Sequence, residues 1–384
     1  YLAHLRECSL VVTEEAGDVM RYRLLETLRE YAQERLESLA QTEQTHRHQE
    51  FYLALARTAE PSLAGGDQKH WFQLLEADHD NFRAALEGCQ TEPARAAIGL
   101  EMCYLLWRFW WAQGYFTEGR TRISKLLAAG RDIPPRVFGE AKIVYGAFAT
   151  VQNDYSEARP ALEEGLALSR QEDNQAGIAL ALNNLSIIAR EQGEHVAARD
   201  YLEEALQIRQ AIGDRRGIAG ILNNLGNVYY ALDDEPTSSR YFREALAINR
   251  EVGNTVWMAV NLNNLGGNSQ QIGNNSVARR YFEEALNLRR NVNDRQGIAS
   301  SLLSLGIVYL ELGDVERAAQ ALHESLQQSV AVGRRSYISE GLQKCGILAL
   351  HKEDTVVATQ LFAASTHLAS QIDFLPTHLS QKRL

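Results

Sequence analysis

Apolar residues recur along this chain with a period of 40 residues. The rows that begin at 161, 201, 241, 281 and 321 align without a gap and read ALEEGLALSR, YLEEALQIRQ, YFREALAINR, YFEEALNLRR and ALHESLQQSV. Within one unit, Leu222, Leu225, Gly226 and Tyr229 have the i, i+3, i+4, i+7 spacing of one buried helical face. The pattern predicts two helices per unit, and the fixed period predicts an elongated array of such units.

Small residues predict where the two helices of a unit cross closely, Gly226 in the first helix and Ala245 in the second. Together with Leu225, Tyr229 and Phe242, they have a spacing that resembles the tetratricopeptide repeat, whose usual length is 34 residues. The six additional residues are expected to lengthen the second helix or the turn into the next unit. Since one unit cannot bury its apolar face alone, neighbouring units are expected to stack.

The resemblance implies an all-α fold, a right-handed α-solenoid of about seven helical hairpins with a concave surface lined by the first helices. In a less regular upstream unit, Trp107 and Trp110 occupy the buried slots and Trp111 is expected to be partly exposed.

Alternating β-rich runs before the array, SLVVTEE and VMRYRLL, predict a β-hairpin. The predicted domains are a hairpin with a helix at 1–40, a helical linker region at 41–97, the repeat array at 98–372 and a C-terminal cap at 373–384.

Composition argues against several classes of protein. A formal net charge of -10, spread over alternating acids and bases, disfavours a nucleic-acid-binding face. The four cysteines are far apart and suggest neither a zinc site nor a disulfide framework, so we expect a reducing cytoplasm. The sequence contains no signal peptide and no membrane-spanning run that we recognise. Because it begins with Tyr1, we expect it to be a piece of a longer chain.

A hairpin that leads into a helix resembles the wing of a winged-helix domain. The segments RYRLLETLREYAQERL, WFQLLEADHDNFRAAL, GYFTEGR and LFAASTHLASQIDF are similar to the region that follows the nucleotide-binding and winged-helix modules of bacterial signal-transduction ATPases with numerous domains (STAND), such as antibiotic regulatory proteins and LuxR-type regulators. This resemblance implies a sensor region in signal transduction or transcription regulation. The sequence has no G-x-x-x-x-G-K-[ST] phosphate loop, so the implied nucleotide-binding module is expected upstream of Tyr1.

Candidate chemistry is sparse. The consecutive residues Asp78, His79 and Asp80, with His70 nearby, cannot converge on a metal ion because neighbours on a helix point about 100° apart. We find no nucleophile elbow, no cysteine-histidine signature and no H-E-x-x-H motif. The sequence therefore predicts no catalytic residues, no metal and no cofactor, and hence not an enzyme.

Asparagines at a repeated position of the first helices are the strongest candidates for binding. With the buried direction set by Leu222 and Tyr229, Asn223, Asn224 and Asn227 lie about 100°, 200° and 140° around the helix and should all avoid the core. That arc predicts a groove that contacts a ligand or partner. Its predicted residues are Asn183, Asn184, Arg190, Asn223, Asn224, Asn227, Tyr230, Asn263, Asn264, Gln270 and Ser304.

The pattern also resembles kinesin light chains and the peptide-sensing regulators of Gram-positive bacteria, in which an asparagine of this slot meets a bound peptide. The resemblance assigns that role to Asn184, Asn224 and Asn264, whereas Ser304 and Lys344 depart from it. The expected partners are a peptide or protein and the upstream module, without membrane or nucleic-acid contact. Two alternatives stay open: a sensor of a sugar or metabolite, as in the superhelical domain of the maltose-regulon activator, and a passive scaffold in which the asparagines bond only neighbouring helices.

Overall fold

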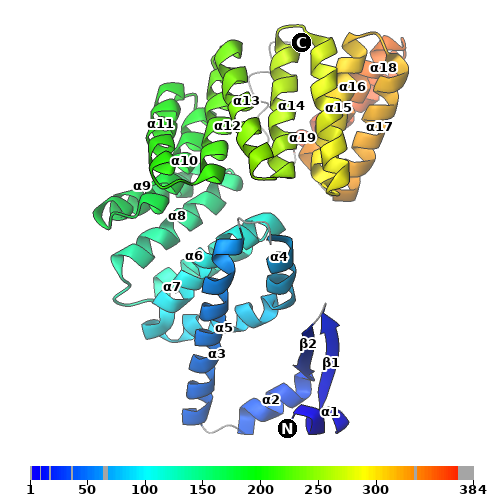
Figure 1. Cartoon of the computed structure of the whole chain (residues 1–384). Coiled ribbons are helices and arrows are strands. Elements are labelled where there is room, and N and C mark those ends of the chain that lie inside the picture. Colours follow the sequence, from blue (N-terminus) through cyan, green and yellow to red (C-terminus); the bar gives the residue numbers. More distant parts are fainter. Residues whose placement is uncertain are drawn as a thin grey trace. The chain divides into compact units, whose positions relative to one another are not determined.

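The computed structural model describes residues 2–8, 10–16, 19–35, 38–63, 68–332 and 335–370, and most of them are helical. They form two compact units, Tyr1–Gln192 (unit 1) and Gly193–Leu384 (unit 2), which Figure 1 shows as successive colours. The predicted all-α repeat fold is confirmed, as a solenoid-like succession of helical hairpins within each unit. The predicted domain limits at 40, 97 and 372 stay predictions, and the predicted cap at 373–384 lies outside the described residues.

Unit 1 begins with a short helix and a β-hairpin and continues with helices. Its elements are α1 (Leu2–Glu7), β1 (Val11–Ala16), β2 (Val19–Leu24), α2 (Glu26–Arg35), α3 (Ser38–Ala59), η1 (Glu60–Ser62), α4 (Gln68–Ala77), α5 (His79–Thr91), η2 (Pro93–Arg95), α6 (Ala96–Gln113), α7 (Phe116–Ala129), α8 (Pro135–Val151), α9 (Tyr155–Gln171) and α10 (Gln175–Glu191). The strands pair antiparallel, with Val11 opposite Leu24 and Ala16 opposite Val19, as the alternating pattern predicts.

Unit 2 consists of consecutive helices that pack side by side, each against the next in the chain (Figure 1). They are α11 (His195–Ala211), α12 (Arg215–Ala231), α13 (Glu235–Glu251), α14 (Thr255–Gln271), α15 (Asn275–Asn291), α16 (Arg295–Glu311), α17 (Val315–Val332), α18 (Arg335–His351) and α19 (Thr355–Ser370).

The 40-residue period arises from helices of equal length. Both helices of a repeat, for example α12 and α13, have 17 residues, and three-residue turns separate them from each other and from α14. The expectation that only the second helix or one turn would lengthen is therefore wrong. A nearly whole additional turn lengthens each helix, which keeps the two packed along their full length.

Most turns between the described helices of unit 2 share one backbone geometry, with a positive φ at positions 213, 233, 253, 273, 293, 313 and 353. At the end of α11, Gly213 has φ +72° and its N–H donates to the Gln210 carbonyl at 3.2 Å, while the Asp214 N–H donates to the Arg209 carbonyl at 3.0 Å. These are the two bonds of a Schellman motif, which needs a left-handed residue at this point. The Asp214 carboxylate then accepts from the Gly217 N–H at 2.8 Å and caps α12.

Close packing explains the glycine of the first helices. A Cβ atom at Gly226 would lie 2.5 Å from the ring of Phe242 on α13, which is buried. The predicted close crossing is present, and a phenylalanine ring fills it beside the buried Ala245. In unit 1, Trp110 is buried and Trp111 is 38% exposed, as expected. Trp107, expected in a buried slot, is only half-buried.

Within the described part of the chain, no helix is both long enough and apolar enough to cross a membrane.

Candidate functional site

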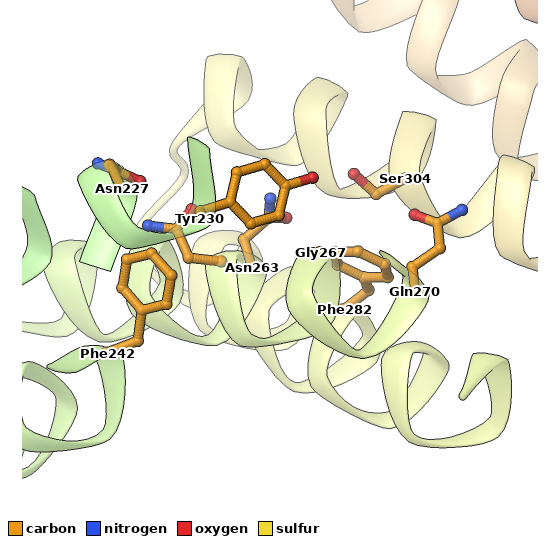
Figure 2. A pocket seen from close by; sticks show the side chains of 9 residues that line it. Asn227, Tyr230, Phe242, Asn263, Gly267, Gln270, Phe282 and Ser304 are labelled. Carbon is orange, nitrogen blue, oxygen red and sulfur yellow. The ribbon is translucent and has the colours of Figure 1, made fainter. Parts of the chain in front are cut away.

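A shallow groove of about 220 Å³ lies on the first helices of unit 2, where α12, α14 and α16 follow one another. We call it the amide groove. Figure 2 shows Asn263, Gly267 and Gln270 along α14, with Tyr230 and Ser304 reaching toward them from α12 and α16. The residues that line it are Asn227, Tyr230, Phe242, Asn263, Asn264, Gly267, Gln270, Phe282 and Ser304.

Helical spacing brings these side chains to one surface. On α14, Asn264, Gly267 and Gln270 are three residues apart and only half-buried, whereas Leu265 and Gly266 between them are buried. Asn227 and Ser304 are the half-buried members of the same stripe on α12 and α16. All nine residues that line the groove are uncharged, so it presents amide, hydroxyl and aromatic groups to a ligand.

A chain of buried amides holds one wall of the groove. Asn249 Nδ2 on α13 donates to Asn261 Oδ1 at 2.8 Å, and Asn261 Nδ2 donates to Asn223 Oδ1 at 3.0 Å. Asn264 Nδ2 donates to the same Asn223 oxygen at 2.9 Å. Since Asn223, Asn249 and Asn261 are all almost fully buried, the chain fixes the amide plane of Asn264 at the groove surface.

A second chain of buried hydrogen bonds reaches the amide of Asn263, next to Asn264. Arg289 Nη1 on α15 donates to the Gly297 carbonyl and to Ser301 Oγ, each at 2.6 Å, and Ser301 Oγ donates to Asn263 Oδ1 at 3.4 Å. Burial lowers the pKa of the Arg289 guanidinium, and the Asp294 carboxylate, 3.9 Å from its Nε, opposes that shift. Asn263 and Asn264 are thus each the last member of a hydrogen-bonded chain that starts on a second helix.

The structure brings together six of the predicted groove residues: Asn227, Tyr230, Asn263, Asn264, Gln270 and Ser304. Asn224 is half-buried beside them and accepts from Asn223 Nδ2 at 3.5 Å. The prediction that the asparagines all avoid the core is wrong for Asn223, which is 4% exposed, because α14 covers the side of α12 on which it lies.

The three predicted residues of unit 1 do not belong to the amide groove. Asn183, Asn184 and Arg190 lie on α10. Asn184 is also buried, against expectation, and its Nδ2 donates to the Leu180 carbonyl at 2.8 Å within its own helix. Arg190 pairs with Glu191.

The sequence did not predict that Phe242, Phe282 and Gly267 line the groove. It also did not predict that Asn249 and Asn261 belong to the buried amide chain that holds Asn264. Asn249 had a detectable signal, because it falls on the otherwise apolar face of its helix together with Phe242. Gly267 follows the packing glycine Gly266 and has no counterpart in the preceding unit, which carries Asn227 at that position.

A larger hollow of about 580 Å³ in unit 1 is less suited to a ligand. It is formed by α7 and by the end of α8, with Arg120 among its residues. That guanidinium already donates to Asp154 at 2.7 Å, to Gln152 at 2.8 Å and to Tyr145 at 3.3 Å. Its charge and donors are used within the protein.

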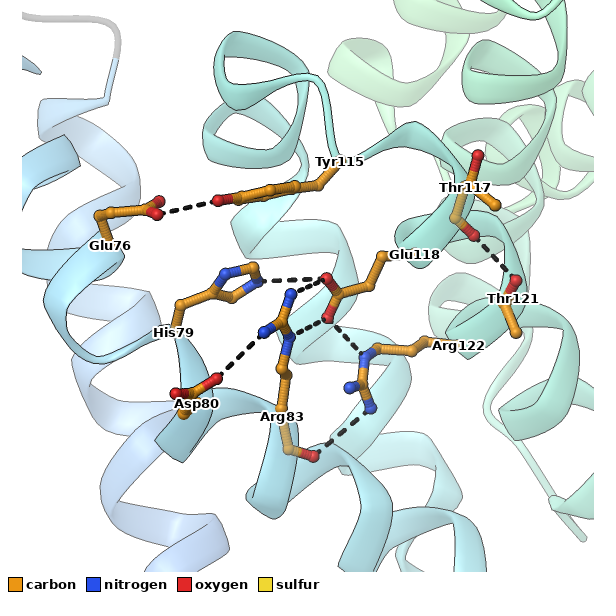
Figure 3. A network of polar contacts seen from close by, with 9 residues as sticks. All are labelled: Glu76, His79, Asp80, Arg83, Tyr115, Thr117, Glu118, Thr121 and Arg122. Atoms are coloured by element: carbon orange, nitrogen blue, oxygen red, sulfur yellow. Dashed lines mark hydrogen bonds and ion pairs between the residues drawn. The ribbon is translucent and has the colours of Figure 1, made fainter.

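Two of the sequence motifs meet in an ion-pair cluster of unit 1 (Figure 3). Arg83 on α5 donates to both oxygens of Glu118 on α7, at 2.9 and 2.7 Å, and Arg122 Nε donates to the same carboxylate at 2.9 Å. Burial alone would raise the pKa of Glu118, but the hydrogen bonds from Arg83 and Arg122 outweigh it and lower the pKa to about 2. The cluster joins α5 to α7 and explains these motifs as packing signals.

His79 belongs to the same cluster. It is 5% exposed, stacks on Tyr115 at a centroid distance of 4.5 Å and has its Nε2 3.5 Å from Glu118. Burial lowers the pKa of His79, and the Glu118 carboxylate opposes this. Among the residues with described positions, no three His, Cys, Asp or Glu side chains are grouped as metal ligands.

Paired helices of mostly 17 residues, a glycine at most of their crossings and a polar groove on the first helices are the features of tetratricopeptide repeats. The family model for the tetratricopeptide repeat matches residues 140–211, 217–291 and 257–329, so these parts of the chain are tetratricopeptide repeats. The fold of such repeats is typically non-catalytic, and none of the comparisons indicates a catalytic family.

Three curated relatives are predicted HTH-type transcriptional regulators, one from Mycobacterium bovis and two from strains of Mycobacterium tuberculosis. Each is 26% identical over 189 residues, which is 47% of this chain. The match spans only 21% of the length of each of these relatives.

Two solved structures show the same fold. A Rap protein complexed with competence and sporulation factor is 14% identical, with a TM-score of 0.60 over 86% of this chain and 93% of that one. A STAND protein with a tetratricopeptide repeat sensor from Pyrococcus horikoshii is 13% identical, with a TM-score of 0.58 over 96% of this chain and 58% of that one.

Proposed function

We propose that this chain is the sensor region of a larger signalling or regulatory protein and that it binds a peptide, or an extended segment of a protein, in the amide groove. The observation that carries the proposal is the pair of adjacent amides, Asn263 and Asn264, each held by a buried hydrogen-bond chain. A carboxamide offers a donor and an acceptor together and can pair with a peptide unit without reading its side chain.

The fixed orientation of these amides favours binding. A flexible surface asparagine loses rotamer freedom when it binds a ligand, at a cost of about 0.5 to 1.5 kcal/mol for each immobilised side chain. Asn264 has already lost that freedom through its bond to Asn223. Its Oδ1 takes no part in this bond and can accept from a ligand N–H.

The shape and polarity of the groove favour a peptide over the alternative of a sugar or metabolite. Small-molecule sites are usually concave and predominantly apolar, and they bury most of the ligand. The amide groove is instead polar and open to solvent. A passive scaffold would also hold Asn264 by its bond to Asn223, but it would bind no peptide, so a binding experiment separates the two.

We further propose that occupancy of the groove regulates a nucleotide-dependent switch in an upstream module of the same cytoplasmic protein. Support comes from the STAND protein of P. horikoshii, to which 96% of this chain is similar in fold and whose own chain is longer. The mycobacterial relatives are also longer than the segment that they share with this chain. In the full-length protein, addition of a groove-binding peptide should change the rate of nucleotide exchange or hydrolysis.

The binding proposal is tested by selecting linear peptides of random sequence on the purified chain and measuring the affinity of the selected peptides for variants. Asn227→Ala combined with Ser304→Ala should weaken binding about 30-fold, since each lost hydrogen bond contributes on the order of 1 kcal/mol and the two together about 2 kcal/mol. Glu244→Ala, an exposed position on α13, is the matched control and should bind like the unmodified chain.

If the double variant binds the selected peptides as tightly as the unmodified chain, the groove is not the site. Native mass spectrometry of the purified chain examines the alternative, because a co-purified sugar or metabolite that survives desalting would favour a small-molecule sensor over a peptide sensor.

A further inference from the structure

Gly267 lies within α14, one turn before its end, at a point where no neighbouring atom requires glycine. Apart from its chain neighbours and the backbone of its own helix, no described residue has an atom within 4 Å of the position that its Cβ would occupy. The adjacent Gly266 is different, since a Cβ there would lie 2.6 Å from the ring of Phe282. Glycine within a helix is destabilising relative to alanine, so Gly267 weakens α14 without any gain in packing.

The empty space beside Gly267 belongs to the amide groove. Gly267 lines the groove between Asn263 and Gln270, and Figure 2 shows the hydroxyl of Tyr230 directed toward this part of it. The same position carries Asn227 one unit earlier and Ile307 one unit later. Of these three units, the one that contains α14 is the one without a side chain at this position.

We propose that Gly267 keeps open a subsite that receives one uncharged side chain of the bound peptide. This inference rests on the proposed function. Phe282, Asn263 and Gln270 line the groove together with Gly267. A charged ligand side chain would lose water there and meet no opposite charge among the lining residues, which is unfavourable. The Glu311 carboxylate, which accepts from Gln270 at 3.1 Å, is exposed, so water screens its charge. An apolar or hydroxyl-bearing side chain fits this chemistry.

Gly220 on α12 offers a matched control. It is also a helical glycine whose missing Cβ would have no described atom within 4 Å beyond its chain neighbours and its own helix backbone, but it does not line the amide groove. Gly267→Ala and Gly220→Ala should therefore each raise the melting temperature by roughly 2 to 4 °C, because alanine restricts the unfolded chain and favours the helix. A rise in both shows that glycine at 267 serves no structural need.

The affinity for a bound peptide should distinguish variants at Gly267 from variants at Gly220. With a peptide selected on the unmodified chain, Gly267→Leu should weaken binding at least tenfold because the leucine fills the subsite, while Gly220→Leu should leave the affinity unchanged. An alanine scan of the peptide then identifies the residue that enters the subsite. Replacing that peptide residue by alanine should weaken binding to the unmodified chain and leave binding to Gly267→Leu unchanged. Replacing it by aspartate or lysine should weaken binding to the unmodified chain at least tenfold.

Two failures are distinguishable. If selected peptides lose affinity in the Asn227→Ala, Ser304→Ala variant but bind Gly267→Leu normally, the groove binds peptide and the subsite proposal is wrong. If no selected peptide depends on Asn227 and Ser304, the proposed function fails and the subsite proposal fails with it. A fall in melting temperature for Gly267→Ala would also overturn the inference, because it would mean that packing requires the glycine.

Discussion

Replacing Glu118 by glutamine tests whether the ion-pair cluster stabilises unit 1. The carboxylate accepts from Arg83 and Arg122, and its side chain is only 17% exposed, so solvent screens these bonds weakly. A pKa lowered from 4.5 to about 2 corresponds to about 3 kcal/mol of stabilisation at neutral pH. Arg83 is 41% exposed, so water can hydrate its guanidinium once the carboxylate is removed. We therefore expect Glu118→Gln to lower the free energy of unfolding by about 2 to 3 kcal/mol.

Urea unfolding at pH 7, followed by tryptophan fluorescence, measures this loss. Trp110 packs near α7 and reports the relevant region. Glu43→Gln is the control, since Glu43 pairs with Arg47 on α3 with both side chains more than 60% exposed, and its loss should cost no more than about 0.5 kcal/mol.

The pH dependence of the difference gives a second check. The folded-state pKa of Glu118 is below the unfolded value, so its stabilisation is complete above about pH 4.5 and is lost as the pH falls toward 2. The gap between the unmodified chain and Glu118→Gln should close over that range. A gap that does not change with pH, or a loss no larger than that of Glu43→Gln, would refute the reasoning.

Three further predictions concern packing and reactivity. Gly226→Ala should destabilise unit 2 by about 1 to 3 kcal/mol, because the methyl group would overlap the ring of Phe242, and a melting temperature equal to that of the unmodified chain would contradict this. Asn223→Ala should cost about 1 to 3 kcal/mol in urea unfolding, because two amide donors lose their shared acceptor; an unchanged midpoint would mean that the buried chain is not stabilising. Burial raises the pKa of Cys89 to about 12, so a thiol reagent at pH 8 should label the exposed Cys8 quickly and Cys89 only after unfolding, and equal rates would contradict the burial.

Local interactions explain why so much of the fold could be predicted. The apolar spacing that includes Leu222 and Leu225 depends only on the 3.6-residue turn of a helix, and the turn at Gly213 and Asp214 depends on residues a few positions apart. The equal lengths of the two helices could not be predicted in the same way, because a 40-residue period is consistent with either longer helices or longer turns.

The candidate site was partly predictable for the same reason. Asn227 and Asn264 occupy two nearby angular positions that the helix period alone assigns to one face, and both line the groove. Asn223 was misplaced because the angle was measured from a single buried direction. α12 packs against its own second helix, α13, and is also met at Asn223 by Asn261 and Asn264 of α14, so its buried arc is wider than one unit suggests.

The sequence by itself determined the 40-residue unit, the identity of its helices and the row of polar residues on the first helices, because these depend on periodicity within a short stretch of chain. Only the tertiary structure decided which amides are buried and which face the groove. The chain from Asn249 through Asn261 and Asn223 to Asn264 joins residues up to 41 positions apart, and its bonds depend on how adjacent units are stacked. That stacking also left Gly267 facing open space rather than a neighbouring side chain.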